Sequence, residues 1–279
     1  MDTTQKGEFR YGGISPFELQ IRYTETTRDT VTEGRDSHVH PECEVYINLS
    51  GDVSFMVEKR IYPITPGSIV ITRPYEYHHC IYHSDALHRH FWILFSPMGN
   101  ERFLRRFFER EAGEGNLLTL PSKLQGELTE LCHDMVNRPT GEMEEHYRFF
   151  RLLHLLETAN SSEFRSDAYP EDVTMTLDYI NRTFRDSISI NALAKAAHVS
   201  VNTLERHFAD TLHLSPTAYL KKKRLAHAAS VLWAGGTVME ACADSGFSDY
   251  SGFIALFKRA YGMTPLKYKK HVMKKREKQ

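Results

Sequence analysis

The feature that most constrains this chain is an internal repeat in its C-terminal part. The pattern Leu204-x3-Phe208-x7-Pro216-x2-Tyr219 recurs, 49 residues later, as Phe253-x3-Phe257-x7-Pro265-x2-Tyr268. Four matching residue classes at identical spacing indicate a duplicated structural unit. With 279 residues in total, the chain is long enough for this duplication to form one domain of two.

Each copy of the repeat is predicted to contain two helices joined by a tight turn. In the first copy the helix INALAKAA ends at His198-Val199, and Ser200 caps the helix VNTLERHFADTL. In the second copy TVMEACADS ends at Gly246, and Ser248 or Asp249 caps YSGFIALFKRAY. This order makes a helix-turn-helix, whose second helix can lie in the major groove of DNA.

The second helix of the first copy has an apolar face, predicted to point inward, and a polar face. The base contacts predicted on the polar face are Asn202, Thr203, Glu205 and Arg206. Arg206 can donate two hydrogen bonds to guanine, Asn202 can pair with adenine, and Glu205 can accept from cytosine. The alternative is that these are ordinary solvated side chains.

The second copy offers weaker chemistry, because its predicted base contacts are Tyr250 and Ser251, which have hydroxyls but no bidentate donor. We therefore expect the first copy to carry more of the sequence specificity.

The predicted phosphate contacts are six lysines near these helices: Lys221, Lys222, Lys223, Lys258, Lys267 and Lys270. A run of lysines is also typical of a merely solvated helix face.

The charge distribution agrees with a DNA partner once the chain is divided. The formal net charge is only -1, which by itself argues against phosphate binding. Residues 1–170 have 18 Lys and Arg against 26 Asp and Glu, a net of -8, whereas residues 171–279 have 17 against 10, a net of +7. Such asymmetry between halves indicates a nucleic-acid-binding segment.

The C-terminal residues resemble the AraC/XylS family of bacterial transcription regulators. The family's pattern is visible in LAKAAHVSVNTLERHF, in KKKRLAHAASVL and in GFSDYSGFIALFKRAYGMTPLKYKK. The resemblance implies two helix-turn-helix motifs, joined by a linker helix, that contact adjacent major-groove segments of double-stranded DNA. Ala255 departs from the family, because this outward position is often polar or basic in relatives.

The N-terminal part, from about Phe17 to Phe95, has short β-type runs separated by turn residues, a pattern typical of an all-β barrel or sandwich. Within it, His38-x-His40-x3-Glu44-x6-Gly51 is similar to the first motif of the cupin barrel. His38, His40, Glu44 and Tyr46 share parity, so on a regular strand their side chains face the same way.

Three interpretations of this histidine cluster stay open. The residues could line the pocket of an organic effector, formed by His38, His40, Glu44, Tyr46 and His78. They could instead hold a divalent metal through His38, His40, Glu44 and His78, a donor set that suits a transition metal. The third interpretation is ordinary structural hydrogen bonding, and no cofactor is required. His83, His88 and His90 are too loosely spaced to be included.

Between the two parts, the sequence predicts helices. Leu124, Leu128, Leu131 and Met135 form a stripe at alternating four- and three-residue spacing, which is typical both of core packing and of a subunit interface. The predicted domains are a cupin-like barrel in residues 1–98, a helical dimerisation segment in residues 99–160, a linker in residues 161–172 and the DNA-binding domain in residues 173–279.

These patterns predict an α+β chain of two domains: a cupin-like jelly-roll barrel followed by helices, and an all-α domain with two helix-turn-helix motifs. The predicted function is DNA-binding transcription regulation by a small effector, in which a sugar is a candidate. The expected protein is a cytoplasmic homodimer without enzyme activity or membrane contact, and RNA polymerase is a candidate partner. The alternatives are a metal-dependent cupin enzyme fused to a DNA-binding domain, and a constitutive DNA-binding module with a purely structural barrel.

Overall fold

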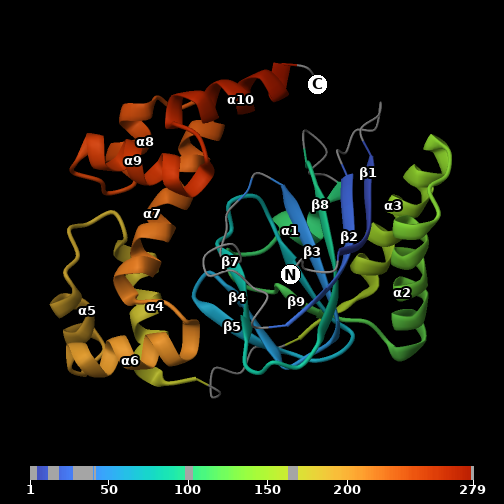
Figure 1. The fold of residues 1–279 in the computed structure, drawn as a ribbon, viewed down its shortest axis with the longest axis horizontal. Coiled ribbons are helices and arrows are strands. Elements are labelled where there is room, and N and C mark those ends of the chain that lie inside the picture. The colour runs from blue at the N-terminus through green and yellow to red at the C-terminus, as the bar shows by residue number, and fades with distance from the viewer. Residues whose placement is uncertain are drawn as a thin grey trace. The chain divides into compact units, whose positions relative to one another are not determined.

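The computed structural model describes residues 5–11, 19–27, 40, 42–97, 103–162 and 169–277. It divides into two compact units (Figure 1): residues 1–37 and 42–164 belong to the first, and residues 38–41 and 165–279 belong to the second. The first is rich in strands and the second is helical, which confirms the predicted α+β class with two domains. The predicted linker, residues 161–172, includes residues 163–168, which lie outside the described residues.

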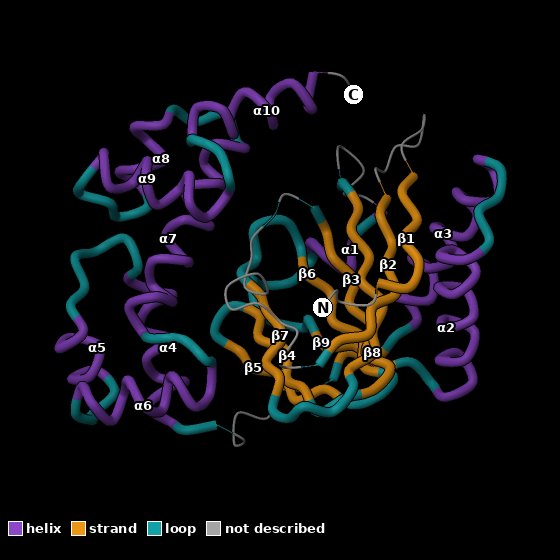
Figure 2. The backbone as a smooth tube through the Cα atoms, in the orientation of Figure 1, coloured by secondary structure: helices purple, strands orange, loops and turns teal. Residues whose placement is uncertain are grey.

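The strands of the N-terminal unit form two antiparallel sheets (Figure 2). The larger has the order β1-β2-β8-β3-β6-β9-β10 and the smaller the order β5-β4-β7. The bounds are Gln5–Tyr11 for β1, Leu19–Thr26 for β2, Cys43–Ser50 for β3, Val53–Val57 for β4, Arg60–Ile64 for β5, Ser68–Thr72 for β6, His78–Tyr82 for β7, His88–Phe95 for β8, Leu117–Thr119 for β9 and Asn160–Ser161 for β10.

The predicted jelly-roll barrel takes the form of two sheets that are not closed into one among the described strands. None of their pairings joins the three-stranded sheet to the seven-stranded one, although side chains of both sheets pack in one cluster around Tyr46, Phe55 and Tyr62. Closure depends on strand tilt and stagger, which the alternation of residues along single strands does not specify. The cupin-like strand content is therefore confirmed, in the form of two facing sheets.

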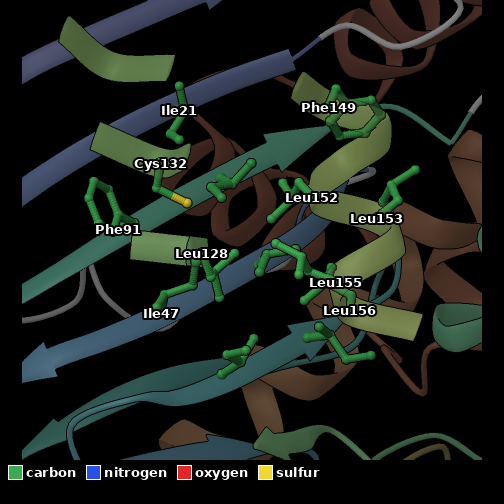
Figure 3. Close-up of a cluster of buried hydrophobic side chains, with 14 of the residues drawn as sticks. Ile21, Ile47, Phe91, Leu128, Cys132, Phe149, Leu152, Leu153, Leu155 and Leu156 are labelled. Atoms are coloured by element: carbon green, nitrogen blue, oxygen red, sulfur yellow. The ribbon is translucent and has the colours of Figure 1, made fainter. Parts of the chain in front are cut away.

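The helices of this unit cover the other face of the large sheet. Helices α1 (Arg105–Phe108), α2 (Ser122–Asn137) and α3 (Glu142–Thr158) follow the strands in the chain. Figure 3 shows Ile47 and Phe91 of the sheet packed against Leu128 of α2 and Leu152 of α3, all buried. Core packing thus accounts for the α2 stripe: Leu128 and Met135 are buried there, and Leu124 and Leu131 pack against the same cluster.

The C-terminal unit consists of seven helices in the described residues: α4 (Glu171–Thr183), α5 (Ile190–Ala196), α6 (Val201–Leu212), α7 (Pro216–Trp233), α8 (Val238–Asp244), α9 (Tyr250–Tyr261) and α10 (Pro265–Glu277). Helices α5 and α6 are the first predicted helix-turn-helix, α8 and α9 are the second, and α7 joins them. None of the described helices is both long and apolar enough to span a bilayer.

The repeat is explained by burial, because all eight of its defining residues are buried. Equivalent ring pairs form in both copies, with centroids 6.5 Å apart for Phe208 and Tyr219 and 5.4 Å apart for Phe257 and Tyr268. Burying aromatic rings of this size is a main source of stability in a small helical unit. The repeated spacing is therefore a packing pattern that places two similar surface helices.

Turn geometry separates the two helices of each copy. Ser200 caps α6 by accepting a hydrogen bond from the Thr203 amide, as predicted. The N-cap of α9 is Asp249, whose side chain makes no cap bond. Gly246 has a φ of +75°, and a Cβ at this position would lie 2.5 Å from the Arg185 carbonyl oxygen, so the second turn requires glycine.

Candidate functional site

The outward face of α6 has the composition that the sequence predicts. Asn202, Glu205 and Arg206 are exposed, whereas Leu204 and Phe208 beneath them are fully buried. Thr203 is half-buried, and its hydroxyl lies 2.8 Å from that of the capping residue Ser200, so part of its hydrogen-bonding capacity is used inside the helix. The three exposed side chains can form the hydrogen bonds that distinguish base pairs in the major groove.

The exposed side chains of helix α9 include fewer hydrogen-bonding groups than those of α6. Tyr250 and Ser251 are exposed at its start, as predicted, and Ala255 lies exposed one turn later. The first exposed cations, Lys258 and Arg259, are in its last turn. The helix can therefore offer hydroxyls and apolar contacts to thymine methyl groups, but no bidentate donor in its first two turns.

The six predicted phosphate contacts differ in exposure. Lys221, Lys258, Lys267 and Lys270 are exposed, and Lys222 and Lys223 are half-buried. Two neighbouring cations are used within the unit instead. The Arg224 guanidinium donates to the carbonyl oxygens of Phe184 and Asp186 at 2.7 and 2.6 Å, and the Lys269 ammonium donates to the Gly235 carbonyl oxygen at 2.9 Å.

The second candidate site lies between the two sheets. Glu44 and Tyr46 of β3 point toward the three-stranded sheet, where the Glu44 carboxylate lies 3.2 Å from His78 Nε2 and the Tyr46 ring lies 4.7 Å from the Phe55 ring. This confirms the predicted parity of Glu44 and Tyr46. His38 lies outside the described residues, so its predicted role stays a prediction.

His78 and Glu44 form a buried pair. His78 Nδ1 donates to the Glu76 carbonyl oxygen at 2.7 Å, which leaves Nε2 facing Glu44. Burial alone would lower the pKa of His78, but the Glu44 carboxylate outweighs this effect and raises it. The Glu44 carboxylate therefore favours the protonated, charged form of His78.

His40 adds a third potential ligand atom, and the donor atoms of His40, Glu44 and His78 all lie within 4.8 Å of one another. Two imidazoles and one carboxylate suit a divalent transition metal, and tetrahedral coordination would need donor atoms about 3.4 Å apart. The backbone bond of His78 Nδ1 is the kind that orients a metal-binding imidazole. The residues present thus have the donor types that such an ion needs, at separations of up to 4.8 Å.

Two histidines that the sequence analysis left out surround Tyr46. His88 Nδ1 donates to the Ser50 carbonyl oxygen at 2.7 Å, so its Nε2 is free to accept from the Tyr46 hydroxyl. The His90 ring stacks on both the Tyr46 and His88 rings, with centroids 4.7 Å apart in each case. Burial lowers the pKa of His88 to about 4 and that of His90 to about 3, so both are neutral near pH 7.

Two further side chains in this region, Asn48 and Thr72, were missed because the lack of a hydrogen-bond partner is a three-dimensional property. Both amide atoms of Asn48, the Thr72 hydroxyl and His90 Nδ1 are buried without a hydrogen-bond partner among the described residues. Leaving such groups unpaired is costly, so they indicate a place for a polar ligand. The available signal was that Asn48 continues the parity of Glu44 and Tyr46.

Comparisons with known proteins agree with this division of the chain. Two family models match it: an AraC-like ligand binding domain over residues 25–158 and a helix-turn-helix domain over residues 193–271. The HTH-type transcriptional activator RhaS of Escherichia coli (strain SE11) is 25% identical over 248 residues, 82% of this chain and 85% of RhaS.

Two other similar proteins match more narrowly. An AraC-like transcription regulator of Streptomyces antibioticus is 31% identical over 160 residues, which are 54% of this chain and about half, 52%, of that protein. A solved transcriptional regulator from Chromobacterium violaceum is 22% identical with a TM-score of 0.34 and covers 36% of this chain and 91% of its own. The matched models and named relatives describe a transcription regulator and not an enzyme.

Proposed function

The chain belongs to the AraC family of transcription regulators, and from this premise we propose that it binds specific DNA sequences under the control of a small molecule held between its two β-sheets. The observation that carries the proposal is the duplicated helix-turn-helix, in which α6 exposes Asn202 and Arg206 above a fully buried core. Exposed lysines beside these helices supply contacts to phosphates.

The DNA-binding part is tested with the full chain and a duplex selected from a random-sequence library. Binding is measured by fluorescence anisotropy at several salt concentrations, against a random duplex of equal length. We expect the selected duplex to bind at least about 10³-fold more tightly. Equal affinity for both duplexes at every salt concentration would contradict the proposal.

We further infer that the effector is an uncharged molecule with hydroxyl groups, such as a sugar. Among the described residues between the sheets, the Glu44 carboxylate is already paired with His78, and both His88 and His90 are neutral near pH 7. Asn48, Thr72 and His90 offer unsatisfied polar atoms, and the Tyr46 ring offers a stacking surface. These features suit hydroxyl groups on a small ring.

The effector class is tested by thermal shift with sugars, their uronic acids and their amino-sugar counterparts. We expect only neutral compounds to raise the melting temperature, because a charged group would enter a buried site without a partner. A rise with a uronic acid alone would contradict this class. No shift with any compound would favour the constitutive module with a structural barrel. Effector control requires different effector affinity for two states of the protein.

A second candidate ligand for the same region is a divalent metal held by His40, Glu44 and His78, and the clustering of their donor atoms favours it. The bound ion would supply a fixed positive charge beside the effector. Metal analysis of protein purified without an affinity tag tests this candidate. We expect about one equivalent in the wild type, little in His40→Ala, and an unchanged content in His83→Ala, whose imidazole bonds to Ser54 instead. Metal-free wild-type protein that Zn²⁺ does not stabilise would contradict it.

We propose a homodimer that pairs through α3. This helix leaves Met143, Tyr147 and Phe150 exposed at 86%, 65% and 42%, and Phe103 lies beside Phe150 with ring centroids 6.3 Å apart. Exposed apolar side chains at this spacing are typical of a helix-pairing surface. Sedimentation analysis is expected to show a dimer that Tyr147→Glu dissociates and Lys123→Glu on α2 leaves intact. A monomeric wild type would contradict this proposal.

We place the protein in the cytoplasm, where reducing conditions suit four cysteines that form no disulfide: Cys43, Cys80, Cys132 and Cys242. RNA polymerase is the partner proposed for the DNA-bound state. In vitro transcription from a template that contains the selected site tests this partner. We expect a change in transcript level that the Arg206→Ala variant reduces, and an unchanged level would contradict it.

A further inference from the structure

One side chain of α6 connects the proposed base contact to a buried acid on another helix. His207 Nδ1 lies 2.8 Å from a carboxylate oxygen of Asp172, and His207 Nε2 lies 3.5 Å from Arg206 Nη2. The Asp172 side chain is 8% exposed and that of His207 is 30% exposed, whereas Arg206 lies in solvent. The three residues thus form a chain from the interior to the candidate DNA-binding surface.

The hydrogen-bonding capacities of the three groups fix the direction of this chain. An ionised carboxylate can only accept, so His207 Nδ1 must carry the proton and donate it to Asp172. In a neutral imidazole the other nitrogen, Nε2, then has a free lone pair. An arginine guanidinium can only donate, so Arg206 Nη2 is the donor to His207 Nε2. Each donor in the chain thus faces an acceptor: Arg206 donates to His207, and His207 donates to Asp172.

Asp172 lies in the first turn of α4, where unpaired backbone amides and the helix dipole favour a carboxylate. On the recognition helix, Leu204 and Phe208 are fully buried and hold the backbone that carries His207. The acceptor offered to Arg206 is therefore attached to two fixed elements, α4 and α6.

We propose that Asp172 and His207 are positioning residues, which hold the Arg206 guanidinium in the orientation needed to contact a base. This inference rests on the proposed role of Arg206 in DNA recognition. A free arginine side chain has many rotamers, and a rigid fork loses less entropy on forming two hydrogen bonds. His207 supplies a fixed acceptor at one edge of the guanidinium and leaves the other donors directed toward DNA.

Two substitutions of His207 separate positioning from simple attachment of α6 to α4. The amide nitrogen of asparagine takes the place of Nδ1, so His207→Asn keeps the donor to Asp172 but removes the acceptor for Arg206. The longer glutamine amide takes the place of Nε2, so His207→Gln keeps an acceptor near Arg206. A purely structural role predicts that asparagine is tolerated better, and a positioning role predicts that glutamine is.

The experiment measures the preference of the full chain for its selected duplex over a random duplex, together with the melting temperature. We expect His207→Asn to lower the preference by about three- to tenfold and His207→Gln to restore most of it, with melting temperatures close to that of the wild type. In an Arg206→Ala background, His207→Asn should have no further effect, because the group that it positions is gone. His213→Asn, at the left-handed C-cap of the same helix, is the matched control, since asparagine adopts that conformation readily.

The outcomes distinguish this inference from the proposed function. A wild type that prefers its selected duplex, combined with a His207→Asn variant that keeps the full preference, overturns the positioning role alone. Equal losses from His207→Asn with and without Arg206 also overturn it. A wild type without any sequence preference overturns the regulator function, and the positioning role with it.

Discussion

The two units of the molecule place their uncommitted polar side chains on opposite sides of the core. In the helical unit Asn202 and Arg206 lie outside, over buried Leu204 and Phe208. In the β-rich unit Asn48, Thr72 and His90 lie inside, between the sheets. Exposed polar groups suit a large polyanion such as DNA, whereas buried ones suit a ligand small enough to be enclosed. The location of polar groups therefore separates a DNA-binding unit from a sensor unit.

The largest expected difference between the units is their response to acid. His88 and His90 have pKa values lowered to about 4 and 3, below the unfolded value of about 6.5. At a pH between the folded and the unfolded pKa values, the unfolded chain binds more protons than the folded protein. The free energy of unfolding therefore falls as the pH falls. Two protons give a slope of about 3 kcal/mol per pH unit near pH 5. The pKa of His78 is raised, so its contribution is present below the unfolded pKa, is lost only as pH rises through the folded value, and is flat near pH 5.

This difference can be measured in the full chain because it has two tryptophans, Trp92 in β8 and Trp233 in α7. Single-tryptophan variants report the unfolding of each unit separately. Lowering the pH from 6 to 5 should shift the Trp92 transition strongly and the Trp233 transition less, since the histidine with a lowered pKa in the helical unit, His227, is only half-buried. His90→Gln should remove about half of the Trp92 slope. A wild-type slope near zero would show that these histidines are not buried neutral groups.

The next largest effect contrasts two fully buried asparagines of the β-rich unit. Asn116 donates to the Ile71 carbonyl oxygen and to Glu76 at 2.8 and 3.1 Å, whereas Asn48 has no partner among the described residues. Asn116→Leu should destabilise the protein by about 3 kcal/mol, because it leaves buried acceptors unpaired. Asn48→Leu should change stability by less than about 1 kcal/mol but abolish the thermal shift with the effector. Equal destabilisation by both substitutions would assign Asn48 a structural role.

A smaller effect compares the two recognition helices. Arg206→Ala should cost about 1 to 3 kcal/mol on the selected duplex and relax the preference at one base pair. Ser251→Ala at the start of α9 should cost less than about 1 kcal/mol, because a single hydroxyl gives little discrimination. Anisotropy titrations on the selected duplex and its single-base variants measure both values. A larger loss from Ser251→Ala would reverse the proposed order of the two copies.

The smallest effect separates phosphate contacts from base contacts. Lys221 is exposed at the start of α7, so Lys221→Ala should weaken the binding of every duplex similarly and reduce the salt slope by about 0.9. Lys123→Ala on α2 is the control for overall charge. If Lys221→Ala changed the preference between duplexes, Lys221 would be a base contact.

Much of the helical unit could be predicted from the sequence, because its determinants are local. The turns and the inward side chains of α6 depend on residues within a few positions of each other, and the repeat is visible as the same spacing in two segments of the sequence. The two copies also show the limit of this approach: they share buried positions, but Asp249 makes no cap bond where Ser200 does. Nothing in the repeat indicated that Arg224 and Lys269 bond within the unit.

The β-rich unit was predicted less completely. The parity of Glu44 and Tyr46 was correct, because alternation along a strand is also local. The predicted cupin-like barrel is present as two sheets, without pairings that close it among the described strands. His88 and His90, which the sequence spacing did not include in the cluster, lie beside Tyr46. Tyr46 meets His88 across 42 residues of sequence, a contact that depends on how β3 and β8 pair.

The sequence by itself determined the class of the two units, the duplicated helix-turn-helix and the side of each helix or strand on which a residue lies. The tertiary structure alone decided that the α2 stripe is core and that the strands form two sheets. It also decided that the Asn48 amide and His90 Nδ1 are buried without a hydrogen-bond partner among the described residues, while His207 has two partners. The physical reason is the distance along the sequence over which each property is determined. Periodicity is set by consecutive residues, whereas a hydrogen-bond partner or its absence is set only when distant segments have packed together.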